Sequence, residues 1–223
     1  MPALKYLDGG TWKTMTLPTG IHVGTDPPDP AIKQVWMDTD EVVPAPTRVT
    51  SLPASPYEGQ ECFYVASATA GVLWRLRYNA ASASAFKWEF VGGSALHSEV
   101  ITPETCASSA FTDIATVGPQ ITMPLAGEYD FYGFARVTVA SASNNQYVAG
   151  LKIGAAGVQT GAAFVVFDND NNTTATRGFS GGSVLRRQVA AADVCKMVYS
   201  TSNIGAIPTF SNRRMNAIPI RVG

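Results

Sequence analysis

One stretch decides the fold class of this 223-residue chain: Gly127-Glu128-Tyr129-Asp130-Phe131-Tyr132-Gly133-Phe134-Ala135-Arg136-Val137-Thr138-Val139. Successive side chains of a β-strand point to opposite faces, and one face of this stretch holds only apolar or small residues: Tyr129, Phe131, Gly133, Ala135, Val137 and Val139. The other face mixes polar residues with two aromatic ones: Asp130, Tyr132, Phe134, Arg136 and Thr138. The pattern predicts a long strand whose first face lies in a sheet core.

Shorter strand-like segments continue on both sides of this stretch. The chain contains 20 glycines and 14 prolines, which interrupt it too often for long helices. Regular strands and turns are typical of an all-β sandwich or jelly roll, which we expect over residues 95–223. The other strands expected there cover residues 100–102, 113–117, 120–123, 146–153, 162–167, 173–181, 183–189, 194–200 and 218–222.

Residues 48–94 are predicted to form a separate small β module with three strands, at 62–66, 72–78 and 86–91. In the second strand Val72, Trp74, Leu76 and Tyr78 share one face, and in the third strand the aromatic side chains Phe86, Trp88 and Phe90 share one face. Three strands with a shared aromatic face are about the minimum for an independently stable sheet.

Residues 1–47 are predicted to form an N-terminal anchor and a proline-rich linker. Asp8-Gly9-Gly10, with Tyr6 and Trp12 around it, is a hairpin signal. A single hairpin is not stable alone, so one interpretation is that it docks on a partner or a sister chain. The other interpretation is a frayed terminus.

The linker contains two stiff proline segments, 25–30 and 44–46, on either side of a short strand candidate at 35–38. Trp36 lies in that candidate strand. Together with Tyr6 and Trp12, it is our candidate for anchoring the chain to a larger assembly.

Charge and composition argue against nucleic-acid binding, a membrane span and a secretory signal. The formal net charge is −1, with 16 basic and 17 acidic residues, and charged residues make up 15% of the chain where about 25% is usual. The basic pairs at 186–187 and 213–214 are too small for a nucleic-acid surface. No run of 18 apolar residues predicts a membrane span, and residues 1–5 lack the apolar segment of a secretory signal.

The residues that usually carry catalysis or bind metals are few and scattered. Cys62, Cys106 and Cys195 are odd in number and far apart, so we expect free, buried thiols. His22 and His97 lie in different regions, which disfavours a zinc site or a nucleophile–histidine pair. We therefore expect no enzyme activity and no cofactor.

The segment 168–172 (DNDNN) begins like a calcium-binding loop. However, Thr173 and Phe179 stand where such a loop needs glycine and glutamate. A polar tip between two strands is the preferred interpretation. A weak, irregular cation site at Asp168–Asp170 stays open.

The middle of the chain resembles a small β module of minor tail and tail-fibre proteins from tailed bacteriophages. The resemblance rests on 51–61 (SLPASPYEGQE), followed by 63–65 (FYV), 74–79 (WRLRYN) and 87–93 (KWEFVGG), about 45 residues in all. In addition, 35–40 (VWMDTD) resembles a short phrase common in fibre proteins.

The C-terminal part resembles the jelly-roll trimers of the tumour-necrosis-factor and complement-C1q type, a fold that phage fibre heads reuse. The similar segments are 125–131 (LAGEYDF), 184–189, 192–194 and the closing strand 214–222 with its phrase PIRV at 219–222. Where those families have Gly-Asp before a late strand, this chain has Ala192-Asp193. The resemblance implies a trimeric jelly-roll head.

Together, these observations lead us to expect a virion structural protein that is a homotrimer. Tyr132 and Phe134 are the candidates for the subunit interface, because aromatic residues are enriched there. A sheet or loop of the same chain covering them is the alternative.

We expect a component of the tail tip or tail fibre, joined to other virion proteins by its N-terminal segment. Its head would touch a glycan or protein of the host surface. The alternatives are a trimeric capsid decoration or head-fibre protein and, less favoured, a protein that binds or degrades polysaccharide.

Overall fold

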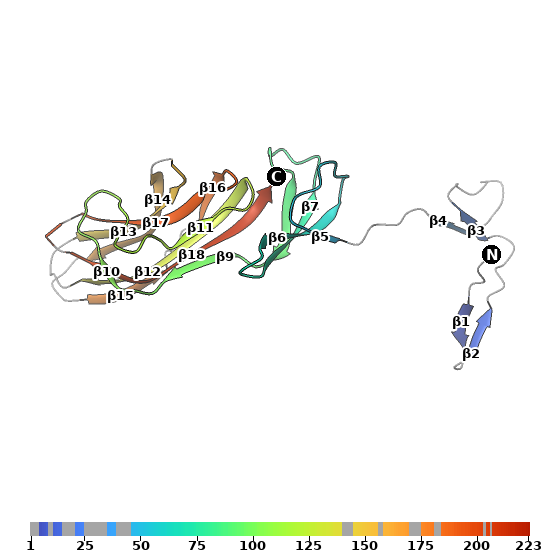
Figure 1. Ribbon diagram of the computed structural model, residues 1–223, viewed down its shortest axis with the longest axis horizontal. Coiled ribbons are helices and arrows are strands. Elements are labelled where there is room, and N and C mark those ends of the chain that lie inside the picture. The colour runs from blue at the N-terminus through green and yellow to red at the C-terminus, as the bar shows by residue number, and fades with distance from the viewer. Residues whose placement is uncertain are drawn as a thin grey trace. The chain divides into compact units, whose positions relative to one another are not determined.

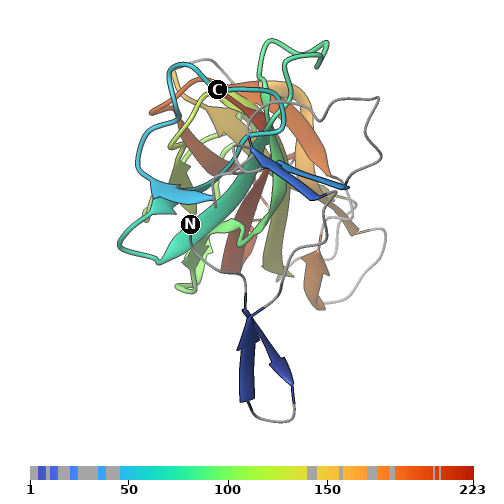
Figure 2. The same cartoon turned by 90° about the vertical axis from the view of Figure 1, so that its right-hand side faces the viewer.

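The chain is described from a computed structural model, which covers residues 5–8, 11–14, 21–24, 35–38, 46–139, 145–155, 158–169, 175–180, 184–202, 204–205 and 207–223. These residues form strands and loops without any helix, so the predicted all-β class is confirmed. Figures 1 and 2 show arrows and loops throughout. The chain divides into two compact units, Met1–Ala45 and Pro46–Gly223.

The first unit contains two pairs of short strands. β1 (Lys5–Asp8) and β2 (Thr11–Thr14) pair antiparallel, with Leu7 opposite Trp12, which confirms the predicted hairpin. β3 (Ile21–Gly24) and β4 (Val35–Asp38) pair in parallel. The strand predicted at 35–38 is therefore confirmed, and His22 belongs to a strand that the sequence did not indicate.

The second unit is built from two sheets. The larger has ten strands in the order β15-β12-β18-β8-β7-β6-β5, with β16 on β12 and with β9 and β10 on β18. Its strands are β5 (Thr47–Val49), β6 (Glu61–Ser67), β7 (Val72–Tyr78), β8 (Trp88–Gly93), β9 (Leu96–Val100), β10 (Glu104–Thr105), β12 (Gly127–Val139), β15 (Ala175–Ser180), β16 (Leu185–Val189) and β18 (Thr209–Val222). The smaller has the order β11-β17-β13-β14, from β11 (Gln120–Thr122), β17 (Val194–Thr201), β13 (Asn145–Ile153) and β14 (Val158–Asn169).

The two sheets pack face to face. Phe164 of β14 lies directly over Gly133 of β12, where a Cβ atom would come within 2.5 Å of the phenyl ring. Tyr199 of β17 and Phe210 of β18 also meet between the sheets, with ring centroids 4.8 Å apart. The result is a two-layer sandwich with an aromatic core.

β12 has the bounds and the two faces that its sequence predicts. The six residues of its predicted core face are all buried. β12 pairs with β18 from Gly127 to Thr138, and β16 and β15 share its other edge. This strand is therefore central to the larger sheet.

The three strands expected within residues 48–94 are present as β6, β7 and β8, but they do not form a separate module. β8 pairs with β18, with Trp88 opposite Val222. The fully buried ring of Trp74 lies 6.1 Å from that of Tyr129 in β12. Residues 48–94 and 95–223 thus share one sheet and one core, and the boundary lies at 45/46.

Three further strand predictions need correction. Residues 113–117 form no strand, and only a single bridge joins Thr112 to Tyr199. The strand expected at 100–102 is β9, which ends at Val100. The closing strand covers residues 209–222 instead of 218–222, because it pairs with nearly all of β12.

Candidate functional site

The candidate site is the outer face of the larger sheet, formed by the residues of β12 that point away from the core and by their neighbours. Tyr132 lies opposite Asn216 of β18, which lies opposite His97 of β9. One step along, Phe134 lies opposite Arg214. Antiparallel neighbours on one face lie about 5 Å apart, so these side chains form adjacent rows.

Two predicted interface residues are thereby brought to one surface. Tyr132 is 37% exposed, so the described part of the chain does not cover it. Phe134 and Ile218 are half-buried on the same face. Tyr132 is the aromatic side chain that a partner could bury there.

Ion pairs within the chain flank these apolar side chains. The guanidinium of Arg186 donates two hydrogen bonds to the carboxylate of Asp130, at 2.8 and 2.9 Å. On the other side, Arg214 Nε lies 2.6 Å from Glu99 Oε1. Each of these charges already has an opposite charge as its neighbour.

A row of four charged side chains and one amide crosses five strands of the same sheet near the start of β12. Glu89 lies between Arg77, at 3.1 Å, and Arg221, at 3.9 Å, and Arg221 reaches Glu128 at 3.6 Å. Gln188 of β16 ends the row with a 3.4 Å hydrogen bond to Glu128. Hydrogen bonds from Asn79 and Arg77 hold the pKa of Glu89 below its usual value. This row ties β7 and β8 to the sandwich.

The predicted anchor residues are less fully described. The backbones of Tyr6, Trp12 and Trp36 belong to β1, β2 and β4, but their side chains lie outside the described part of the chain. Asp168 is near the end of β14, and its side chain and the whole of Asp170 also lie outside it. Anchoring and the cation site therefore stay predictions.

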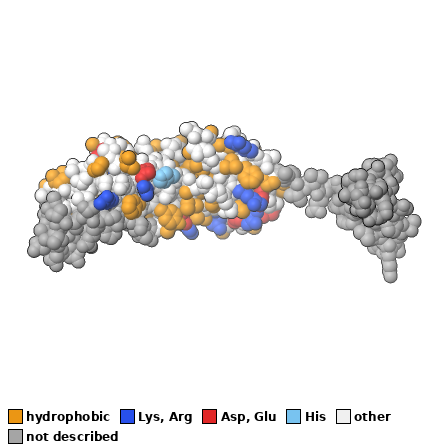
Figure 3. Space-filling model, turned by 90° about the horizontal axis from the view of Figure 1, so that it is seen from below, with side chains coloured by type: hydrophobic (Ala, Val, Ile, Leu, Met, Phe, Trp, Pro, Cys, Tyr) orange, Lys and Arg blue, Asp and Glu red, His pale blue; other side chains and the backbone are white. Residues whose placement is uncertain are grey.

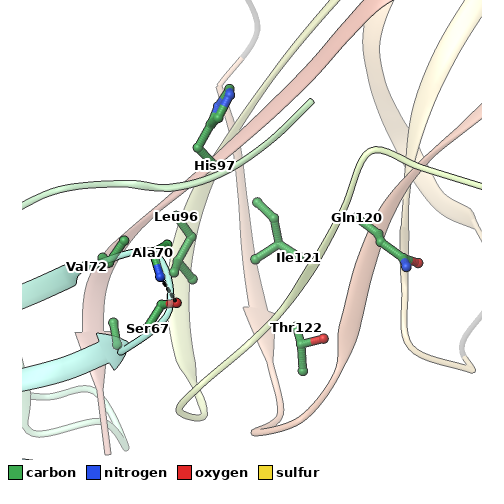
Figure 4. A pocket seen from close by; sticks show the side chains of 9 residues that line it. Ser67, Ala70, Val72, Leu96, His97, Gln120, Ile121 and Thr122 are labelled. Carbon is green, nitrogen blue, oxygen red and sulfur yellow. Dashed lines mark hydrogen bonds between the residues drawn. The ribbon is translucent and has the colours of Figure 1, made fainter. Parts of the chain in front are cut away.

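A hollow of about 280 Å³ lies between the β6–β7 turn, the start of β9 and β11, lined by Ala66, Ser67, Ala70, Val72, Leu96, His97, Gln120, Ile121 and Thr122. Figure 4 shows His97 pointing away from the other labelled side chains. The imidazole instead meets Asn216, with 2.8 Å between Nδ1 and Oδ1. Ser67 Oγ accepts a hydrogen bond from the Ala70 amide. These lining residues therefore contain no serine–histidine hydrogen bond.

Arg213, which the sequence suggested only as half of a basic pair, is fully buried. It donates to Glu104 Oε2 at 3.0 Å and to the carbonyl oxygens of Thr102, Thr116 and Gly118 at 3.3–3.4 Å. Its guanidinium carbon lies 5.5 Å from the ring centroid of Tyr199. Arg213 thus holds the long segment between β10 and β11 against the sandwich.

Glu104 is the acidic partner in this arrangement. Burial on its own would raise the pKa of its carboxyl group, but hydrogen bonds from Thr116 and the charge of Arg213 hold that pKa below its usual value. The site is a structural clamp, since the groups to which Arg213 donates all belong to the segment 102–118 and are joined by it to β18.

The three cysteines are free and buried, as predicted. Burial raises the pKa of Cys62 to about 11 and that of Cys195 to about 12, which disfavours the reactive thiolate.

Among the described residues, no three His, Cys, Asp or Glu side chains gather closely enough to hold a metal ion. In the same part of the chain, no helix has the length and apolar character to cross a membrane.

Comparisons with known proteins find little. No protein-family model matches the chain, and no curated protein matches it. Among solved structures, it is similar to the Stig cyclase Fisc from Fischerella sp. TAU, in complex with (3Z)-3-(1-methyl-2-pyrrolidinylidene)-3H-indole, with TM-score 0.26 and 10% identity over 76% of this chain and 81% of that one. A chain of infectious bursal disease virus, Gx strain, gives TM-score 0.21 and 12% identity over 65% of this chain and 40% of that one. Likenesses this weak carry no functional argument.

Proposed function

We propose that this chain is a structural protein of a tailed-bacteriophage virion, a component of the tail tip or tail fibre that forms a homotrimer through the outer face of its larger sheet. The observation that carries the self-association is Tyr132, which is 37% exposed between ion pairs that the chain closes within itself. The virion assignment rests on the resemblance of residues 51–93 and 125–222 to phage and jelly-roll proteins.

The outer face has the chemistry of a protein interface. Aromatic residues are enriched at interfaces, and free charges are depleted at their centres. Because Arg186 and Arg214 already have carboxylate partners, covering this face leaves neither charge without one. Apolar area buried from Tyr132, Phe134 and Ile218 would contribute about 25 cal/mol per Å².

Figure 3 shows one face of the second unit. Hydrophobic and uncharged surface dominates there, and the charged side chains occupy small groups. Such a surface supports contact with neighbouring subunits, since few charged side chains would lose their hydration when the subunits associate.

The same proposal assigns a role to the first unit and to the outward end of the sandwich. The first unit, with Tyr6, Trp12 and Trp36, would attach the protein to other virion proteins. The sandwich would face outward and contact a glycan or protein of the host surface. The same architecture would also serve a capsid decoration or head-fibre protein, which differs in its position on the particle.

Analytical ultracentrifugation of the full chain at micromolar concentration tests the self-association. We expect a mass three times the 23.6 kDa of one chain. Tyr132→Asp should yield monomers, because it places an unpaired charge in the interface. Tyr57→Asp, at another exposed tyrosine outside the strands, should remain trimeric. A monomeric wild-type protein would contradict the proposal.

Immunogold electron microscopy of phage particles that carry the protein tests its position. Label at the tail supports the tail-fibre assignment, and label on the capsid supports the decoration assignment. Particles without label would show that the protein is not part of the virion.

A further inference from the structure

One segment of the sandwich, residues 113–118, is held in place by side chains alone. It belongs to the loop that begins after β10, at the end of the sandwich far from the C-terminus in Figure 1. In the described part of the chain, no backbone–backbone hydrogen bond involves these residues. The backbone is bonded again on either side of them. Thr112 exchanges two hydrogen bonds of 2.9 Å with Tyr199, and the Pro119 carbonyl accepts one from Met197 at 3.0 Å. We call residues 113–118 the strap.

The carboxylate of Glu104 is the centre of the bonds that hold the strap. It accepts hydrogen bonds from the Thr116 amide at 2.9 and 3.0 Å and from the Thr116 hydroxyl. The same carboxylate pairs with the guanidinium of Arg213 at 3.0 Å. Arg213 in turn donates bonds of 3.3 and 3.4 Å to the carbonyl oxygens of Thr116 and Gly118. Glu104 therefore holds the strap directly, and also holds the cation that bonds to it.

The other contacts of the strap are few. The Tyr199 hydroxyl donates to the Gly118 carbonyl at 2.9 Å, and Lys196 pairs with Asp113 at 2.6 Å. The Ile114 side chain is buried, whereas Val117 is 45% exposed. A segment with so little buried apolar surface and no backbone pairing can open while the rest of the fold stays intact.

Arg213 makes the closed strap depend on the charge of Glu104. Its guanidinium is fully buried, and an arginine stays protonated in a protein. Its Nε is buried without a hydrogen-bond partner in the described part of the chain, so Glu104 provides the counter-charge. If Glu104 gained a proton, the closed strap would enclose a cation without a counter-charge, which is strongly unfavourable. An open strap would let water reach that cation.

We propose that the strap is an acid-sensitive latch, closed while Glu104 is charged and open, with the sandwich intact, when Glu104 is neutral. Among the described residues, the other ionisable groups around this carboxylate are Arg213 of β18, Tyr199 of β17 and Asp113, which Lys196 of β17 pairs. The inference goes beyond the proposed function and does not depend on trimer formation.

The direction of the pH response follows from the contacts of Glu104. Burial raises the pKa of its carboxyl group, but hydrogen bonds from Thr116 and the charge of Arg213 together hold that pKa below its usual value. Opening removes these contacts, so the pKa returns towards about 4.3. The closed strap is therefore favoured at higher pH, and this advantage is lost as the pH falls through the lower pKa of the closed state. We expect opening below about pH 4.

A spin label on Ala115→Cys in the full chain tests the inference by electron paramagnetic resonance. Ala115 is exposed on the strap, and the native cysteines are buried, so the label attaches to the new thiol. At pH 7, Glu104→Gln should increase the ratio of mobile to restricted label by about tenfold or more, because charge-assisted bonds become neutral ones. The same ratio should rise in the labelled parent below about pH 4. Glu99→Gln, which removes the carboxylate of the exposed pair with Arg214, is the matched control and should change nothing.

Unchanged mobility in Glu104→Gln, or in the labelled parent down to about pH 3, would overturn the inference. Hydrogen exchange measured in parallel should leave the amides of β12 protected, and their loss of protection would show global unfolding instead of a local latch. Asp113→Asn separates the two acids. An acid response that persists in Glu104→Gln but disappears in Asp113→Asn would assign the effect to the pair with Lys196, against the inference. If Glu104→Gln does not fold, the acid titration of the parent decides the question.

Discussion

Two neighbouring arginines show how much a single position in the fold changes the role of a residue. Arg213 is fully buried, and Arg214 is exposed on the outer face beside Glu99. The difference arises at Asn212, which has a left-handed backbone conformation with φ of 47°. The register between β12 and β18 shifts there, so Arg213 points inward.

Replacing Arg213 with methionine should destabilise the protein by about 3–5 kcal/mol. Glu104 would lose its cationic partner, and three carbonyl oxygens would lose a donor. Arg214→Met should cost about 1 kcal/mol or less, because exposed ion pairs contribute little. Urea denaturation gives both free energies of unfolding, and equal losses would show that Arg213 is not a clamp.

Arg213 is also a residue whose importance could not be predicted. In the sequence it is one of two adjacent basic residues, and adjacent strand residues point to opposite faces. Which of the two points inward depends on the bulge at Asn212 and on carbonyl groups about 100 positions earlier in the chain.

At the scale of single elements, the long strand β12 organises the larger sheet. Its alternation predicts its buried face, because a two-residue period alone determines which side chains share a side. It also places the smallest residue, Gly133, under Phe164 of β14. The close approach of the two sheets depends on this glycine.

Gly133→Val should destabilise the protein by about 1–3 kcal/mol, because the new side chain would overlap the ring of Phe164 and push the sheets apart. Gly92→Val in β8 is the matched control, since a Cβ there meets nothing within 4 Å. Thermal unfolding followed by circular dichroism compares the two. A control as unstable as Gly133→Val would mean that the loss of glycine itself is responsible.

Other elements were predicted less well. The closing strand was expected only at 218–222. The structure extends it to Thr209, since β12 provides hydrogen-bonding partners along nearly its whole length. Pairing with a long neighbour overrode the local signal.

At the scale of the molecule, residues 46–223 form one unit instead of the expected module and head. β8 continues the sheet at β18, the ring of Trp74 packs near Tyr129, and the row from Arg77 to Gln188 crosses the junction. A core and a sheet shared in this way favour cooperative unfolding.

Residues 46–223 should therefore unfold in a single transition. In a Trp12→Phe, Trp36→Phe background, tryptophan fluorescence reports on Trp74 and Trp88, which lie in the expected module. Far-ultraviolet circular dichroism reports mainly on the larger sandwich. The two midpoints in urea should coincide, and two separate midpoints would show that 48–94 is an independent domain.

The sequence by itself determined the all-β class, the bounds and buried face of β12, the three strands within 48–94 and the burial of the cysteines. These features follow from local periodicity and residue type. Only the tertiary structure decided that Arg213 is buried, that residues 48–94 join the sandwich and that Tyr132 lies among closed ion pairs. Each of these depends on contacts between distant residues, such as Arg213 with Glu104, 109 positions apart, whose meeting no local pattern records.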